Sequence, residues 1–262
     1  MIILASDLDG TLLNRNPEND YIEDEDILAI QQFRLAGHRF GLVTGRAPSL
    51  IANTFLRNPA LKCDFYIFST GALVLDQDGK TLYEKSLPFP LVLRLLHRAE
   101  ELHTETIILC DRAYSYAARL SRDSVSQMEI LWGSKFLDFT PDRVFERRQV
   151  LTIQLSFDDP QKSWQLYTKL KKEFYTQAEF VYNMGSIDIT ASGINKCSGL
   201  SVIEKFFAHP VIPIGDGEND VDMLRSYQGF AIKSGCQQAL DAARYQVRSV
   251  AEAIDFLLHS SI

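Results

Sequence analysis

The chain has 262 residues, of which 46% are hydrophobic and 23% are charged, as expected for a globular protein of one large domain or two modest ones. Its net charge of −7 argues against nucleic acid as a partner, because the field of the whole chain repels phosphate backbones. No run approaches the roughly 18 apolar residues that span a bilayer, and the run at residues 1–5 is too short for a signal peptide. The spacing of the four cysteines favours reduced thiols over disulfides or a zinc site, so we expect a cytoplasmic protein with no membrane partner (Cys63, Cys110, Cys197 and Cys236).

The first part of the chain alternates apolar runs with helical patterns. The pattern predicts strands at residues 1–6, 39–43 and 65–69, and helices at residues 22–36 and 48–56. Asp78-Gly79, between two further apolar runs, predicts a β-hairpin. Strands separated by helices indicate βαβ units and a mostly parallel sheet.

The middle of the chain has a different pattern. Helices are predicted at residues 91–102 and 163–174, with strands at 106–110, 149–157 and 179–182. From residue 187 the βα alternation resumes, with the predicted elements at 196–207, 211–214, near Val221, near Gln237 and at 250–258. The sequence therefore predicts an α/β fold, in which a Rossmann-like parallel-sheet core (1–83 and 187–262) carries an inserted α+β domain (84–186).

Three predicted strands end in clusters of polar residues. The clusters are Asp7-Leu8-Asp9-Gly10-Thr11, Thr44-Gly45-Arg46 and Gly215-Asp216-Gly217-Glu218-Asn219-Asp220. Ligands of open parallel sheets bind outside the carboxyl ends of the strands, so we expect these clusters to meet at one edge.

This convergence would place four carboxylates in one crevice, those of Asp7, Asp9, Asp216 and Asp220. Like charges at such short range need a compensating cation, and hard oxygen ligands suit Mg²⁺. Phosphoryl transfer also needs positive charge and hydrogen-bond donors around the phosphoryl oxygens. The sequence offers these from Thr44, the Gly45 amide, Asn219 and the ammonium of Lys196.

The four groups in this order resemble the motifs of the haloacid dehalogenase (HAD) superfamily, and the long insert resembles the Cof-type phosphatases with a class IIB cap. The matching segments are Asp7–Thr11, Thr44–Arg46, Lys196 and Gly215–Leu224. The resemblance implies a Mg²⁺-dependent phosphatase that hydrolyses small phosphorylated metabolites, such as sugar phosphates, through an aspartyl-phosphate. By this resemblance Asp7 is the nucleophile, and Asp9 is the general acid and base.

The resemblance also implies two sets of ligands. Magnesium is held by Asp7, the main-chain carbonyl of Asp9 and Asp216, with Asp220 binding directly or through water. The phosphoryl group is bound by Leu8, Thr44, Gly45, Lys196 and Asn219.

The sequence departs from the Cof pattern in two places. Thr70-Gly71-Ala72 stands where Asn-Gly-Ala is usual, and Ile232–Cys236 replaces a Met-Gly-Asn-Ala type of turn. Two alternatives therefore stay open: a phosphomannomutase-like phosphotransferase that passes the group to a second sugar, and a sugar-phosphate sensor without turnover. We expect Arg46 to pair with a surface acid rather than with substrate. The oligomeric state cannot be read from the sequence.

Overall fold

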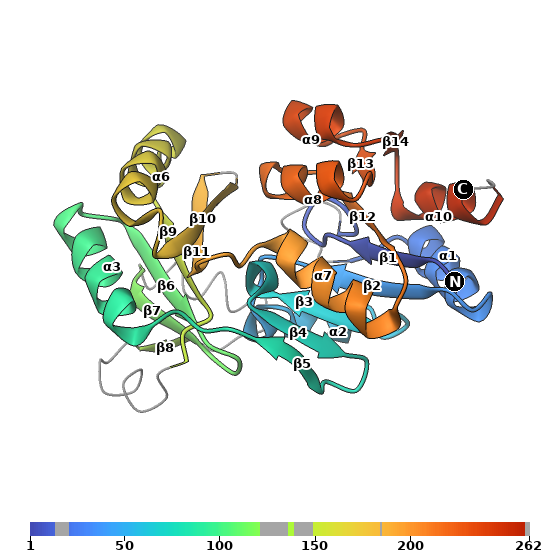
Figure 1. Ribbon diagram of the computed structural model, residues 1–262, viewed down its shortest axis with the longest axis horizontal. Helices are drawn as coiled ribbons and strands as arrows, with labels where there is room; N and C mark the ends of the chain where they lie inside the picture. Colours follow the sequence, from blue (N-terminus) through green and yellow to red (C-terminus); the bar gives the residue numbers. More distant parts are fainter. Residues whose placement is uncertain (14–20, 121–135, 139–148, 184, 260–262) are drawn as a thin grey trace.

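The computed structural model describes residues 1–13, 21–120, 136–138, 149–183 and 185–259. Over these residues the strands form two sheets, which lie side by side in Figure 1. The strand order is β14-β13-β12-β1-β2-β3-β4-β5 in the first sheet and β10-β11-β9-β6-β7-β8 in the second. In the described ranges, no helix has the length and apolar character that crossing a bilayer requires.

The first sheet is parallel from β14 to β3, and β4 and β5 extend it as antiparallel strands. Gly79, with φ of 78°, lies in the turn between β4 and β5, where the Asp76 carboxylate accepts hydrogen bonds from the amides of Asp78 and Lys80. The strands of this sheet are β1 (Ile3–Ser6), β2 (Arg39–Val43), β3 (Phe65–Phe68), β4 (Leu73–Asp76), β5 (Thr81–Glu84), β12 (Val211–Gly215), β13 (Phe230–Ile232) and β14 (Tyr245–Val247).

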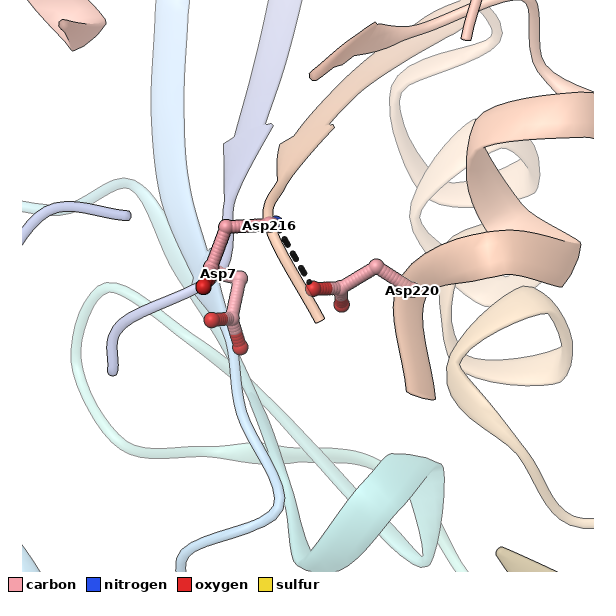
Figure 2. Close-up of side chains that lie close together, drawn as sticks. All are labelled: Asp7, Asp216 and Asp220. Atoms are coloured by element: carbon pink, nitrogen blue, oxygen red, sulfur yellow. Dashed lines mark hydrogen bonds between the residues drawn. The ribbon is translucent and has the colours of Figure 1, made fainter. Parts of the chain in front are cut away.

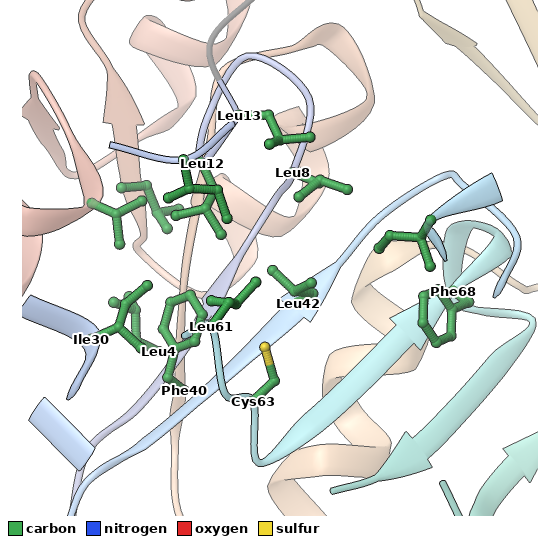
Figure 3. Close-up of a cluster of buried hydrophobic side chains, with 14 of the residues drawn as sticks. Leu4, Leu8, Leu12, Leu13, Ile30, Phe40, Leu42, Leu61, Cys63 and Phe68 are labelled. Carbon is green, nitrogen blue, oxygen red and sulfur yellow. The ribbon is translucent and has the colours of Figure 1, made fainter. Parts of the chain in front are cut away.

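Helices cover both faces of the first sheet. Leu4 of β1 packs with α1 and α10 on one face (Figure 3), whereas Ile3 and Ala5 pack with α7, α8 and α9 on the other. Burying a side chain of the size of leucine stabilises the fold by about 1.5–3 kcal/mol, so these two layers form the main core. The helices are α1 (Asp24–Leu35), α7 (Lys196–Phe207), α8 (Val221–Ser226), α9 (Gln237–Ala242) and α10 (Val250–His259).

The second sheet is antiparallel except for the β7–β8 pair, and it has its own core beneath α3 (Phe89–Glu101) and α6 (Pro160–Phe174). In a further cluster Ile108 and Cys110 of this sheet pack with Ala47 and Leu50, which follow β2. This contact joins the two sheets. The strands are β6 (Thr106–Cys110), β7 (Ser115–Arg119), β8 (Phe136–Asp138), β9 (Thr152–Ser156), β10 (Ala178–Asn183) and β11 (Ser186–Ala191).

The structure confirms the predicted α/β fold and corrects three local predictions. The helix expected at 48–56 is a 3₁₀ turn (Pro48–Leu50) followed by α2 (Ala52–Arg57), because Ile51 has the non-helical angles φ −126° and ψ −1°. The strand expected at 149–157 begins only at Thr152. The βα alternation does not resume at residue 187, because β11 pairs with β9 and β10 in the second sheet.

Candidate active site

The carboxyl ends of β12, β1 and β2 bring the three polar clusters together. These strands are parallel neighbours, in which Ser6 is paired with Ile214 on one side and with Leu42 on the other. Asp7 directly follows β1 and donates its amide to the Ile214 carbonyl at 2.9 Å. The Thr11 hydroxyl donates to Asp216 Oδ1 at 2.8 Å, which ties the first cluster to the third.

Three of the predicted carboxylates form one buried group (Figure 2). Asp7, Asp216 and Asp220 each place an oxygen within 4.8 Å of the others, and they are 5%, 1% and 0% exposed. Burial raises the pKa of Asp7 well above its usual range, Asp220 raises it further, and Lys196 opposes the shift. A cluster of this kind favours binding of a cation, because a cation relieves the repulsion among the carboxylates.

Lys196 supplies one positive charge inside this group. Its Nζ lies 2.6 Å from Asp7 Oδ1 and 2.6 Å from Asp220 Oδ1, and its side chain is 2% exposed. Burial lowers the pKa of Lys196, but Asp220 and Asp7 raise it by more, so the ammonium stays charged. Its position is fixed by a capping box at the start of α7, in which Asn195 and Ser198 bond each other's amides.

Asp220 also organises the loop after β12. Its Oδ2 accepts hydrogen bonds from the amides of Asp216 at 3.0 Å and Gly217 at 2.9 Å, the first of which is drawn in Figure 2. With Oδ1 on Lys196, both oxygens of Asp220 already have partners. Asp7 and Asp216 are therefore better placed than Asp220 to bind a metal directly.

The Asp9 side chain lies apart from this buried group, because Arg46 holds it. Arg46 Nε donates to Asp9 Oδ2 at 2.9 Å, and Arg46 Nη2 contacts Asp9 Oδ1. The side chain of Asp9 is 49% exposed, so Arg46 pairs with an exposed acid as expected, but that acid is the predicted general acid of the site. A ligand role for Asp9 through its main-chain carbonyl stays a prediction.

The structure places the predicted phosphate-binding residues around the same strand ends. Thr44 is buried, and its Oγ1 accepts a hydrogen bond from the Arg46 amide at 3.1 Å. Leu8 is fully buried with its side chain in the core (Figure 3), so it can offer a ligand only its backbone. Gly45 and Asn219 line a cavity with Asp7.

That cavity, of about 190 Å³, lies between the two sheets and contains both Asp7 and Asp9. Its second-sheet lining consists of polar residues that the sequence analysis missed, namely Gln154, Asn183, Ser186 and Asp188. Asp188 is 8% exposed, and burial raises its pKa to about 6 against the opposing hydrogen bonds from Gln154 and Thr70. The one sequence signal was an acid between Ile187 and Ile189 in an apolar run.

A larger groove of about 480 Å³ opens beside this cavity, between α6 and β10 on one side and α8 and α9 on the other. It includes Lys196 and Asn219. At its border the rings of Trp164, Tyr167 and Tyr182 pack in tilted and edge-to-face pairs with centroids 5.0–5.6 Å apart. The smaller cavity is the candidate reaction site, because Asp7 and Asp9, the two predicted catalytic residues, line it.

The donor set fits a hard divalent cation. Asp7 and Asp216 offer carboxylate oxygens, the ligands that Mg²⁺ prefers, and a single ion could bind both. Within the described residues this trio is the one group of three or more acidic, histidine or cysteine side chains close enough to share an ion. The fold and site thus define an α/β protein with a buried carboxylate cluster and a buried ammonium at the edge of a parallel sheet, an arrangement suited to binding a cation.

Comparison with known proteins identifies the family of this chain. The family model of haloacid dehalogenase-like hydrolases matches residues 4–254. The 5-amino-6-(5-phospho-D-ribitylamino)uracil phosphatase YbjI of Escherichia coli K12 is 23% identical over 260 residues, covering 94% of this chain and 90% of that protein. Among solved structures, the subclass IIB sugar phosphatase BT4131 has a TM-score of 0.83 at 19% identity, covering 99% and 98% of the two chains. A haloacid dehalogenase-like hydrolase from B. subtilis has a TM-score of 0.85 at 18% identity, covering 99% of each chain.

The chain therefore belongs to the haloacid dehalogenase-like hydrolases. Within that family it is a phosphatase of the Cof type, as its four motifs indicated.

Proposed function

We propose that the protein is a Mg²⁺-dependent phosphatase that hydrolyses small phosphorylated metabolites, sugar phosphates among them, through an aspartyl-phosphate on Asp7. The observation that carries this proposal is the cluster of Asp7, Asp216 and Asp220 within 4.8 Å, with Lys196 Nζ 2.6 Å from Asp7. A carboxylate nucleophile beside a cation site and an ammonium is what attack on a phosphate dianion requires.

The reaction has two steps. An Asp7 oxygen attacks phosphorus and forms a new P–O bond while the bond to the leaving group breaks. Asp9, protonated and released from Arg46 when substrate is bound, donates its proton to the leaving oxygen. Asp9 then takes a proton from water, whose oxygen attacks phosphorus, and the Asp7–phosphorus bond breaks to release inorganic phosphate. Each proton that Asp9 gives in the first step is recovered in the second, so the enzyme returns to its starting state.

The surrounding residues stabilise the transferred group. When bound, Mg²⁺ supplies charge that cancels the repulsion between carboxylate and phosphate, and its ligands would be Asp7, the Asp9 carbonyl, Asp216 and Asp220, the last directly or through water. Donors from the two neighbouring loops and α7 would hold the phosphoryl oxygens (Leu8, Thr44, Gly45, Lys196 and Asn219). Lys196 leaves Asp7 Oδ2 free of its own contact, since it bonds Oδ1.

We further propose that the inserted domain, predicted at residues 84–186 and extended by β11, acts as a cap that selects the substrate and excludes water. The names of the relatives support a sugar or polyol phosphate, because one is called a phosphatase of a ribityl phosphate and another a sugar phosphatase. Reduced cysteines support a cytoplasmic location, since all four are free. Small metabolites, rather than nucleic acids or membranes, would then be its partners.

Release of inorganic phosphate from p-nitrophenyl phosphate and a panel of sugar phosphates tests the proposal, with Mg²⁺ or with EDTA. We expect turnover in Mg²⁺, loss in EDTA, and a covalent phosphoryl group on acid-quenched protein that Asp7→Asn abolishes. Phosphate release that needs a second sugar as acceptor would favour the phosphotransferase. Binding of sugar phosphates without turnover of any monoester would favour the sensor.

A further inference from the structure

Three consecutive residues after β3 have left-handed backbone conformations. The φ angles are 49° for Ser69, 56° for Thr70 and 104° for Gly71. Glycine adopts such angles without strain, and at position 71 it is required, because a Cβ there would lie 2.2 Å from the Asn195 carbonyl oxygen. For a β-branched residue such as Thr70 the conformation is a true outlier that costs free energy.

Backbone hydrogen bonds hold this strained segment against the loop after β2. The Ser69 amide donates to the Arg46 carbonyl at 2.9 Å, and the Thr70 amide donates to the Thr44 carbonyl at 3.1 Å. The same loop carries Gly45, one of the predicted phosphate-binding residues. A strained conformation persists only where its surroundings enforce it, and such conformations concentrate at functional sites.

The strained backbone places the Thr70 hydroxyl on Asp188. Thr70 Oγ1 donates to Asp188 Oδ2 at 3.2 Å, and Gln154 Nε2 donates to Asp188 Oδ1 at 3.1 Å. The carboxyl of Asp188, in the second sheet, is thus held by the hydroxyl of Thr70, which follows β3 of the first sheet, and by the side-chain amide of Gln154 in its own sheet. Gly45 makes room for it, since a Cβ there would lie 2.9 Å from Asp188 Oδ2.

Asp188 retains capacity for further hydrogen bonds. An ionised carboxylate can accept about four hydrogen bonds, and Thr70 and Gln154 donate two of them. Nearby in the same cavity, Asn183 has a buried Oδ1 with no hydrogen-bond partner among the described residues. The second-sheet lining of the cavity therefore presents hydrogen-bond acceptors, and Asp7 lines the same cavity from the first sheet.

We propose that Asp188 is a specificity-determining residue that accepts hydrogen bonds from hydroxyl groups of the leaving group, and that Thr70 is the residue that positions it. The proposal rests on the phosphatase function proposed above and adds the chemistry of the preferred substrate. That substrate is a monoester of a neutral, hydroxylated alcohol. A second anionic group on the leaving alcohol is disfavoured, because it would face a carboxylate.

The experiment compares two kinds of substrate in wild-type and variant enzymes. The hydroxylated probe is whichever of ribose 5-phosphate, ribitol 5-phosphate and glucose 6-phosphate gives the highest kcat/KM, and the reference is p-nitrophenyl phosphate, which has no hydroxyl group. Asp188→Asn should lower kcat/KM for the hydroxylated probe about 10- to 100-fold more than for the reference, mainly through KM. A hydrogen bond made equally in ground and transition states acts on KM.

The positioning role is tested by removing only the hydroxyl. Thr70→Val keeps the branched shape and should lower the ratio of kcat/KM for the hydroxylated probe to kcat/KM for the reference, by a smaller factor than Asp188→Asn does. Thr70→Ser keeps the hydroxyl and should have the wild-type ratio. Thr152→Val is the matched control, because Thr152 is a fully buried threonine of β9 whose hydroxyl has no partner among the described residues. It should leave the ratio unchanged.

Two outcomes would overturn the inference while leaving the proposed function intact. The first is an equal fractional loss for both substrates in Asp188→Asn, which would indicate a structural role. The second is a wild-type enzyme that turns over p-nitrophenyl phosphate at least as well as every hydroxylated probe. Failure of wild-type protein to hydrolyse any monoester would instead overturn the phosphatase proposal itself.

Discussion

Replacing Lys196 by methionine removes an ammonium that two buried carboxylates share. Lys196 lies 2.6 Å from Asp7 Oδ1 and 2.6 Å from Asp220 Oδ1, and all three side chains are at most 7% exposed. Removing one partner of a buried ion pair costs about 3–5 kcal/mol, because the remaining charge stays uncompensated. Methionine keeps most of the volume of lysine and adapts to irregular space, so the change is mainly one of charge. We expect the free energy of unfolding in EDTA to fall by about 3–5 kcal/mol at neutral pH.

The loss should depend on both metal and acid. A divalent ion on Asp7 and Asp216 would replace part of the missing charge, and a ligand at 100 times its dissociation constant stabilises a fold by about 2.7 kcal/mol. Mg²⁺ should therefore stabilise Lys196→Met more than it stabilises the wild type. The loss should also shrink in acid, because a protonated Asp7 needs no cation, and burial already raises the pKa of this carboxyl.

Urea unfolding followed by far-UV circular dichroism, in EDTA and in Mg²⁺, measures these effects. Lys85→Met is the control, because Lys85 is exposed and its Nζ donates to the Ser192 carbonyl at 2.9 Å. Changes at such surface positions stay within about 0.5 kcal/mol. If Lys196→Met had the stability of the wild type in EDTA, the buried ammonium would not be balancing the carboxylates and the electrostatic reasoning would be refuted.

Three further predictions concern other residues. Asp7→Asn and Asp9→Asn should each abolish phosphate release, and an unchanged far-UV spectrum of Asp7→Asn would separate lost chemistry from lost folding. Burial raises the pKa of Asp26 to about 6 from 3.8, so the fold disfavours the ionised form. The free energy of unfolding should therefore fall as pH rises from about 4 to 6, and above pH 6 it should stay below its value at pH 4. Asp26→Asn keeps an acceptor for the Ala251 amide. In urea unfolding it should therefore raise the free energy of unfolding by about 2–3 kcal/mol above pH 6 and leave it unchanged near pH 4. An equal gain at both pH values would contradict this. Thr70→Asn should melt at a higher temperature in calorimetry than Thr70→Val, which also lacks the hydroxyl but stays β-branched, because asparagine tolerates left-handed angles and relieves about 1 kcal/mol of strain. An equal or lower melting temperature would show that the strain is absent.

The part of the site that could be predicted from the sequence is the part built from strand ends. Asp7, Thr44 and Asp216 each directly follow an apolar run, and the parallel order of β12, β1 and β2 brings them together. That prediction needs only local patterns and one rule about parallel sheets. The bounds of the second sheet were harder to predict, because β11 alternates as a strand whether it pairs with the first sheet or the second.

The second-sheet lining of the cavity depends on strand pairing that no local sequence pattern specifies. Asp188 meets Gln154 because the register of β11 and β9 places these two residues directly opposite each other. A shift of β11 by one residue would turn Asp188 to the other face of the sheet, away from Gln154, so neither residue alone identifies a site. The sequence showed only that one acid interrupts an apolar run.

The replacement of the usual asparagine by Thr70 also has a structural consequence that the sequence does not show. The sequence shows that Thr-Gly-Ala stands in place of Asn-Gly-Ala. It does not show that position 70 is left-handed, because the Thr70 amide is held by the Thr44 carbonyl from a distant part of the chain. The residues proposed for phosphoryl transfer therefore lie in short segments of the sequence, whereas the residues proposed to select the leaving group come together only through contacts between segments. A relative with the same four motifs but other residues at the positions of Gln154 and Asp188 should keep turnover of p-nitrophenyl phosphate and prefer different natural substrates. The reason is that the register of β11 and β9, and not the four motifs, decides which side chains line the cavity from the second sheet.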